Sequence, residues 1–510
     1  MKLDPRSVPY RAAETVARLV WVVVIFSVTS SGVDPAFGVP IVVLGVLAVL
    51  AVAAGYQFAY WQRFEYDLTA DTFDIRSGVL SRRTREIPYK RVQNVDISRN
   101  VFQRLLGVAE VRIETAGGSD TEAHLRFVSA GEATRLQNDL GRLKRGGDAP
   151  EEETPPAAEP LYAITPRELL LLGAVSVDFR LVSFLSVAAP VFWPTFADLF
   201  APFAPPGLQV LSPILLAPLG VLTLYLASVL VGAVVAGTNY YGFRLTREGD
   251  ELRYERGLVQ RFSGTIPLAK VQTLTVRANL LARVIDHASL AVETAGYAPG
   301  DDNGSQSAVP FAERNRVFRL ARSVEPFEDP DFERPPKRAR TRYLVRYGTV
   351  ALGVILGSYL VVRFTPLSGA WWGTLVLLPV VPLAAHAKWS ARGYALQDGH
   401  VITRNGYLVQ TVKVVPYYRV QTVLVSQSPF QRRRDLATLV VDTAGSRSLT
   451  GRDPRAVDID ATTADRLRDE VESRLYEALD DERARRARRR PADRPEAGSG
   501  RLGESSDPAV

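Results

Sequence analysis

Ile87-Pro88-Tyr89-Lys90-Arg91-Val92-Gln93 carries the pattern that decides the fold, because the pattern returns twice further along the chain. The later copies read Ile266-Pro267 before Lys270-Val271-Gln272, and Val415-Pro416 before Arg419-Val420-Gln421. A glycine stands ten residues before each proline, and an acidic residue opening an acidic-Thr-Ala-Gly turn stands 26 residues after it. The glycines are Gly78, Gly257 and Gly406, and the acidic residues are Glu114, Glu293 and Asp442. Self-similarity at fixed internal spacing predicts one structural unit used three times.

Each copy reads as short strands that end in a helix. In the first copy, turn residues separate the short runs Tyr66–Leu68, Phe73–Ile75 and Thr84–Ile87, and Val111–Thr115 alternates apolar with charged residues. A further strand follows the Thr-Ala-Gly turn, at His124–Val128 in the first copy and Ala456–Asp460 in the third. Amphipathic helices are expected at Gly131–Lys144, Phe311–Arg322 and Thr462–Ala478. Six or seven antiparallel strands with one helix predict a small β-sandwich or open barrel closed by that helix.

Pairs of apolar segments precede each copy, and a bilayer-spanning helix needs about 20 apolar residues. The first pair covers roughly 19–33 and 39–61, and the third covers 347–364 and 371–389. Between Leu19 and Gln62 the only charged residue is Asp34. The sequence therefore predicts three transmembrane hairpins, six spans in all, in an α+β membrane protein.

The middle pair is open to two interpretations. Its second member, Leu208–Gly237, is free of charge, but its first begins at the capping box Thr165-Pro166-Arg167-Glu168 and soon meets Asp178 and Arg180. Either this helix crosses the membrane with both charges inside, or Pro166–Arg180 is an interfacial helix and the span is Leu181–Ala197. Charge within a bilayer is costly, which favours the second interpretation. With Arg363, these two residues are the candidate intramembrane polar positions.

Loop charge predicts the orientation of these segments. The loops within the pairs contain no Lys or Arg, whereas the N-terminus and the segments between pairs are basic. By the positive-inside rule, both termini and all three repeated domains face the cytoplasm at the cell membrane. No small-residue cleavage site follows the first apolar run, so we interpret that run as a retained anchor.

The pattern divides the chain into nine parts. They are 1–62, an N-terminal segment with the first hairpin; 63–146, the first domain; 147–164, a linker; 165–240, the second hairpin; 241–324, the second domain; 325–345, a linker; 346–390, the third hairpin; 391–482, the third domain; and 483–510, a disordered basic tail. Both linkers are rich in proline and charge, so we expect them to be extended and flexible.

A membrane hairpin followed by a strand domain with Gly-x-Leu, Pro-x-x-Arg-Val-Gln and Glu-Thr-Ala-Gly motifs resembles the membrane-flanked domain family. Its members are bacterial pleckstrin-homology-like (PH-like) domains, and the repeated form resembles YdbT-type membrane proteins. The resemblance covers the chain except its linkers and tail. It implies membrane-tethered PH-like domains without known catalysis and a role in envelope integrity or defence. A smaller membrane-flanked-domain protein is an expected partner on the same ground.

Composition excludes several kinds of site. The chain has no cysteine and four scattered histidines, which removes disulfides, thiolate metal sites and cysteine nucleophiles. Phosphate-cradling glycine loops, nucleophile elbows and zinc-protease motifs are also missing from the sequence, so we expect no enzyme, no metal and no cofactor. The net charge of +7 is what basic cytoplasmic loops produce, and nucleic acid is not an expected partner.

The repeated polar positions are the candidate interaction sites. They comprise a basic residue, a glutamine and an acid in each domain: Arg91, Gln93 and Glu114; Lys270, Gln272 and Glu293; Arg419, Gln421 and Asp442. They could bind a ligand, but a structural role is favoured, in which base and acid pair across neighbouring strands. The turns that grip inositol phosphates in other PH domains are mostly acidic here, for example Thr69-Ala70-Asp71, which argues against that recognition.

Two functions compete at this point. The first is a non-enzymatic scaffold that presents three cytoplasmic PH-like domains to membrane lipids, protein partners or further copies of itself. Exposed sheet edges are natural docking places for such partners. The second is a lipid-handling or transport protein that uses the transmembrane bundle, with Asp178, Arg180 and Arg363 lining a polar path.

Overall fold

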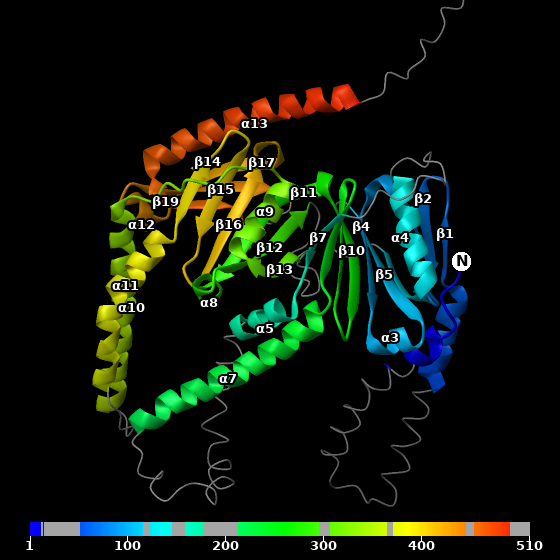
Figure 1. Ribbon diagram of the computed structural model, residues 1–510, viewed down its shortest axis with the longest axis horizontal. Coiled ribbons are helices and arrows are strands. Elements are labelled where there is room, and N and C mark those ends of the chain that lie inside the picture. The colour runs from blue at the N-terminus through cyan, green and yellow to red at the C-terminus, as the bar shows by residue number, and fades with distance from the viewer. Residues whose placement is uncertain are drawn as a thin grey trace, which may run out of the picture.

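The computed structural model describes residues 1–11, 14, 51–115, 123–144, 159–176, 213–294, 307–364, 371–444 and 453–489. Three domains lie in a row, and the helices α7, α10 and α11 extend from the side of the row away from the long helix α13 (Figure 1). Every domain repeats one order of elements: three strands, a 3-10 turn, a fourth strand, a short helix, two strands and a helix. The three copies predicted from the sequence are confirmed in this order.

The first domain shows the unit most simply. Its elements are β1 (Glu65–Leu68), β2 (Thr72–Ser77), β3 (Arg83–Pro88), η1 (Tyr89–Arg91), β4 (Val92–Arg99), α3 (Val101–Leu105), β5 (Val108–Thr115), β6 (Ala123–Ser129) and α4 (Ala130–Lys144). Strands β1 to β3 form one antiparallel sheet, and β4 to β6 form a second. The proline that ends β3 opens the 3-10 turn, which directs the chain from the first sheet into the second.

The other two domains follow the same plan. The second comprises β8 (Arg244–Glu248), β9 (Glu251–Arg256), β10 (Arg261–Pro267), β11 (Val271–Asn279), α8 (Leu280–Val284), β12 (His287–Thr294), β13 (Ser307–Glu313) and α9 (Arg314–Val324). The third comprises β14 (Gly393–Leu396), β15 (His400–Asn405), β16 (Val409–Pro416), β17 (Val420–Ser426), α12 (Pro429–Arg432), β18 (Leu436–Thr443), β19 (Arg455–Asp460) and α13 (Ala461–Arg489).

The last helix of each domain buries one apolar stripe on the second sheet. In α4 the buried apolar positions are Ala133, Leu136 and Leu140. In α13 Leu467 and Val471 are buried and Leu475 packs at the edge of the same core. The stripe that the sequence predicted in the third helix is therefore confirmed, although α13 continues to Arg489, beyond the predicted end at Ala478.

The sheets do not stop at the domain boundaries. The second sheet of the first domain continues into the first sheet of the second, in the order β6-β5-β4-β10-β9-β8-β7. The next boundary is crossed in the same way, in the order β13-β12-β11-β16-β15-β14. The sequence predicted three separate small sandwiches or open barrels, each capped by its helix, and did not predict that their sheets join. Unpaired edge strands expose backbone hydrogen-bonding groups, and pairing them between domains satisfies those groups.

The segments between domains are also more ordered than expected. Within the predicted linker 147–164, β7 (Glu159–Ala163) pairs with β8, and within 325–345 the helix α10 (Lys337–Phe364) already begins. Glu333 forms a bridge to Tyr394 at the start of β14. The flexible connectors predicted from proline and charge are thus wrong for these parts, because each pairs with the strand that follows its hairpin.

The helices preceding the domains are described only in part. Among the described residues, α10 is the one helix long and apolar enough to cross a bilayer. The helix α7 (Pro213–Tyr240) carries no charge in 28 residues, and α11 (Leu377–Ser390) is shorter. The predicted capping box opens α5 (Pro166–Val175), but this helix ends before Asp178. The six predicted spans are therefore not confirmed, and most of the first pair lies outside the described residues.

The repeated glycine has a clear physical role. Gly257 adopts φ +104°, and a Cβ there would lie 1.9 Å from the carbonyl oxygen of Gln260. Gly78 and Gly406 have the same conformation and the same close approach, at φ +111° and +86°. Each begins the turn between the second and third strands, which a side chain would force to open.

Replacing Gly257 by Ala should lower the free energy of unfolding by about 1–3 kcal/mol, because it adds strain and a backbone clash. Thermal unfolding of the purified full-length chain measures this. Gly237→Ala is the control, since a Cβ there meets nothing within 4 Å in the last turns of α7. Equal stability of the two variants would contradict the role given to the turn.

Candidate functional site

The first boundary, here called the first seam, is the antiparallel pairing of β4 with β10. Its register places Arg99 opposite Arg261, Ser98 opposite Phe262 and Ile97 opposite Ser263. The second seam is the pairing of β11 with β16. It extends over six residue pairs, from Leu274 opposite Val414 to Asn279 opposite Val409.

Both seams use the same register when the repeats are aligned. Ala278 occupies in the second domain the place of Arg99 in the first, and Gln410 occupies in the third the place of Arg261 in the second. Ala278 and Gln410 lie opposite each other, as the two arginines do. The fourth strand of one domain therefore receives the third strand of the next in one fixed geometry.

The side chains of two of the repeated basic residues form hydrogen bonds across these seams. Lys270, at the end of η4 (Leu268–Lys270), donates to the carbonyl of Val92 in the first domain at 3.1 Å. Arg419, at the end of η6 (Tyr417–Arg419), donates to the carbonyl of Ala269 in the second domain. The predicted role was an ion pair across strands of one domain, whereas these hydrogen bonds join neighbouring domains.

A repeated acid also crosses a seam. Glu293 on β12 accepts from Lys413 Nζ of the third domain at 2.8 and 3.1 Å, and from Thr275 Oγ1 at 2.9 Å. Lys413 is buried, with 6% of its surface exposed. A buried ammonium needs such a partner, since an unpaired charge there is strongly destabilising. Glu293 therefore holds the second seam together.

At the first seam, the acidic residue that contacts the neighbouring domain is Asp96. Tyr254 of β9 donates to Asp96 Oδ1 at 3.4 Å, and a Cβ on Gly264 would lie 2.3 Å from the same oxygen. Burial raises the pKa of Asp96 to about 6, although the charges of Arg112 and Arg256 oppose this. Glycine at position 264 therefore makes room for a carboxylate from the neighbouring domain.

The remaining predicted residues lie at separate positions in the three domains. Gln272 is buried and donates to the carbonyl of Lys270 at 3.3 Å, whereas Gln421 is exposed on β17. Arg91 is exposed at the end of η1, and Asp442 lies on β18 opposite Thr422. Gln93 and Glu114 lie on β4 and β5, where the structure describes their backbone alone.

The predicted intramembrane charges are not brought together by the described residues. Asp178 and Arg180 lie outside them. Arg363 is exposed and stacks over the ring of Phe364, the last residue of α10. Its position is therefore at a helix end, where a long basic side chain can reach the membrane surface.

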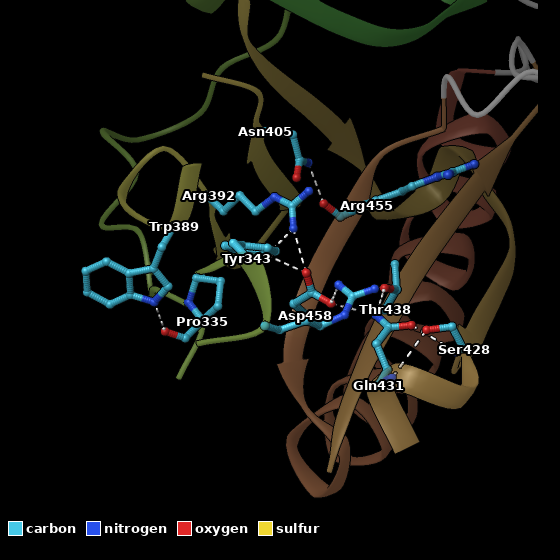
Figure 2. Close-up of polar contacts among 11 residues, drawn as sticks. Pro335, Tyr343, Trp389, Arg392, Asn405, Ser428, Gln431, Thr438, Arg455 and Asp458 are labelled. Carbon is cyan, nitrogen blue, oxygen red and sulfur yellow. Dashed lines mark hydrogen bonds and ion pairs between the residues drawn. The ribbon is translucent and has the colours of Figure 1, made fainter. Parts of the chain in front are cut away.

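A buried ionic cluster joins the third hairpin to the third domain, as Figure 2 shows. Asp458 on β19 is fully buried and accepts from Arg342 at 2.7 Å, Arg392 at 2.6 Å and Gln431 at 2.8 Å. The hydroxyl of Tyr343 also donates to it. Two of these donors lie on α10 and one on α12, so the carboxylate links the hairpin with the domain.

The same short helix links each domain to the segment before it. Asn100, the N-cap of α3, donates to the hydroxyl of Tyr10, and Asn279, the N-cap of α8, donates to the carbonyl of Val175 at the end of α5. In the third domain α12 supplies Gln431 to the Asp458 cluster. Each domain is thus bonded to the segment that precedes it as well as to its neighbours.

Sequence reasoning missed Asp96, Gly264, Lys413 and Asp458. Asp96, Gly264 and Asp458 have no chemical equivalent at the matching places in the other repeats, and Lys413 has one only in Arg85 of the first repeat, so the search for positions shared by all three copies could not find them. The usable signal was instead a charged residue or a glycine at a position where the other copies carry a different type of residue. Among the described residues no group of three potential metal ligands occurs, and the arrangement binds protein elements to one another.

Comparison with known proteins gives a consistent result. The family model described as a bacterial PH domain matches residues 19–144, 206–327 and 351–475. The UPF0699 transmembrane protein YdbT of Bacillus subtilis (strain 168) is 27% identical over 445 residues, covering 81% of this chain and 86% of the relative. The transmembrane protein YdbS of the same organism is 34% identical over 117 residues, covering 22% of this chain and 67% of the relative. Comparison with solved structures gives no match.

Replacing Asp458 by Asn should destabilise the third domain by about 3 kcal/mol, because Arg342 and Arg392 lose their buried counter-charge. Amide hydrogen exchange in β19 and α12 measures the change. Asp460→Asn is the matched control, since Asp460 is partly exposed and its ion pair with Arg338 should contribute less than about 1 kcal/mol. Equal exchange in both variants would contradict the anchoring role.

The first seam should become less stable as pH rises from about 4 to about 6. An ordinary aspartate titrates near 3.9 in the unfolded chain, so the folded state, in which the pKa of Asp96 is about 6, binds its proton more tightly in this range. Asp96→Asn should remove this slope and raise stability at pH 7 by up to about 3 kcal/mol. The midpoint of urea unfolding against pH tests it, with exposed Asp67→Asn as control. An unchanged slope in the Asp96 variant would refute the assignment.

Proposed function

The chain belongs to the bacterial PH domain family, and from that membership we propose that it is a non-enzymatic membrane scaffold holding three PH-like domains as one rigid array. The observation that carries the proposal is the fixed strand register of both seams. Flexible presentation of independent modules would need no such pairing. A scaffold that sets the spacing of three binding surfaces requires it.

The membrane location is supported by relatives named transmembrane proteins and by the apolar helix α10. We extend this to six spans with both termini and all domains in the cytoplasm, on the basis of loop charge. Envelope maintenance or defence is the proposed process. A transport or lipid-handling role is the weaker candidate, because Arg363, the one proposed pathway charge among the described residues, lies at a helix end.

The array has an open strand at each end. In the described sheets, β3 of the first domain and β17 of the third are edge strands. They are the third and fourth strands of their domains, the two kinds that pair at the seams. A second copy of this chain can therefore add its β3 to β17 in the seam register. Such a head-to-tail contact extends an array without closing it.

The side chains of β17 support this partner. Leu424 occupies the place of Asp96 and Thr275 in the other domains. Thr275 is buried at its seam, whereas Leu424 is 45% exposed. An exposed apolar residue on an open edge strand is typical of a surface that pairs with another strand. The smaller membrane-flanked-domain relative is the other protein partner that we propose, through its own third strand.

The register predicts which residues meet between two copies. Val425 corresponds to Ile97 and Val276, and Thr84 corresponds to Ser263 and Val412, so Val425 should lie opposite Thr84. Because the chain has no cysteine, Thr84→Cys and Val425→Cys introduced together give an unambiguous test. Oxidation in membranes should yield disulfide-linked oligomers of the chain.

Val425→Cys with Arg83→Cys is the matched control, since a shift by one residue turns the side chain to the other face of the sheet. Linkage of the control pair as efficient as that of the Thr84 pair would contradict the proposed register. Monomer alone for the Thr84 pair, at native expression level, would exclude self-association. If the Val425→Cys chain forms its disulfide with a smaller PH-like protein instead of a second copy, β17 would be assigned to that partner.

A further inference from the structure

A cleft of about 500 Å³ lies beside the first seam, between α4 of the first domain and the sheet of the second. Its floor consists of β8, β9, β10 and the end of β4, and α4 lines one side. Its charged lining residues are Arg99, Arg244, Arg253, Arg256, Arg261 and Glu255. Five guanidinium groups against one carboxylate make the cleft strongly cationic.

Two of these arginines lie where the repulsion between their like charges destabilises the protein when no ligand is bound. Arg99 and Arg261 lie directly opposite each other across the seam, and like charges at such positions destabilise a sheet. The second seam carries Ala278 and Gln410 at the same two places. Strand pairing therefore does not require the arginines, and their presence in one seam indicates a role beyond joining the domains.

The arginines of the cleft differ in their contacts with other side chains. Arg253 forms an ion pair with Glu248 at 3.2 Å, and Arg256 lies over the rings of Tyr240 and Phe262. Among the described residues, no ion pair engages Arg99, Arg244 or Arg261. These three can therefore share one anion, and guanidinium groups bind phosphate oxygens through paired hydrogen bonds.

The cleft also reaches the end of a helix that we place in the membrane. Tyr241 and Gly242, which line it, follow α7 directly. The neighbouring turn bonds to this helix end, through Gly257 N to Tyr241 O and Leu258 N to Thr238 O. Tyr241, Leu258 and Val259 are 55%, 46% and 47% exposed. Exposed aromatic and apolar residues at the end of an apolar helix are typical of the membrane interface.

We propose that this cleft binds the phosphate of an anionic glycerophospholipid headgroup, held mainly by Arg99, Arg261 and Arg244. The site is distinct from the strand turns with which other PH domains bind inositol phosphates, which in this chain are mostly acidic. The lipid site depends on the proposed membrane position of α7 and does not depend on the scaffold role. Basic pockets at the cytoplasmic membrane surface bind headgroups in this way.

The test uses the full-length chain, delipidated in detergent and titrated with phosphatidylglycerol, with bound lipid counted by native mass spectrometry. Arg99→Ala with Arg261→Gln installs the residues of the second seam, so the fold should persist. At roughly a fivefold loss of affinity for each of the two arginines, this variant should bind phosphatidylglycerol about 30-fold more weakly. Phosphatidylcholine should bind weakly to both proteins, and Arg244→Gln, on the exposed side of the cleft, should give a smaller loss.

Arg82→Ala with Arg83→Gln is the matched control, because it removes the same charge from exposed positions beside the equivalent turn of the first domain. This control should bind like the wild type. Equal binding by wild type and the Arg99/Arg261 variant would overturn the proposal, as would an equal loss in the control. Glycerol phosphate should compete only at much higher concentration. Competition at the same concentration as the lipid would overturn the assignment to a membrane lipid.

Discussion

The pairing of the fourth strand of one domain with the third strand of the next is the interaction on which the rest of the structure depends. It converts three small two-sheet units into sheets that run through the domain boundaries. Small sheets with open edges are marginally stable and prone to wrong pairing. Here the edges satisfy one another, and the side chains around them have adapted to the join. Glu293 with Lys413 and Asp96 with Gly264 are different solutions to the same problem of polar groups at a buried boundary.

The contacts between the domains also constrain the segments that precede them. Each domain contacts the helix before it through its own short helix, and in the third domain through the buried Asp458 cluster. A rotation at a seam would have to move these preceding segments or break such contacts. Such contacts between the array and the segments that precede its domains are what the proposed scaffold of defined spacing needs. The same rigidity would hold the arginines of the basic cleft in place for a ligand.

Much of this could be predicted from the sequence. The constant spacing of glycine, proline and acid gave the repeat, and the strands of the first domain lie within a few residues of their predicted positions. What could not be predicted was the relation between the copies. Lys270 and Glu293 look like an internal pair because both recur at fixed spacing, yet Lys270 bonds to the first domain and Glu293 forms its ion pair with the third. Local pattern specifies a strand but not its partner, since any edge strand of suitable register can supply the missing hydrogen bonds. The linkers were misjudged for the same reason, because β7 is a strand only through its pairing with β8.

Amide hydrogen exchange of the full-length chain at low concentration shows whether the domains pair at the seams in solution. The strands β3, β10 and β16 occupy the same place in their domains, but β3 is an open edge while β10 and β16 are paired at seams. The account predicts slow exchange for the amides of β10 and β16 that face the neighbouring domain and fast exchange for the corresponding amides of β3. Equally fast exchange in all three strands would contradict it, since the domains would then be independent modules on a common chain.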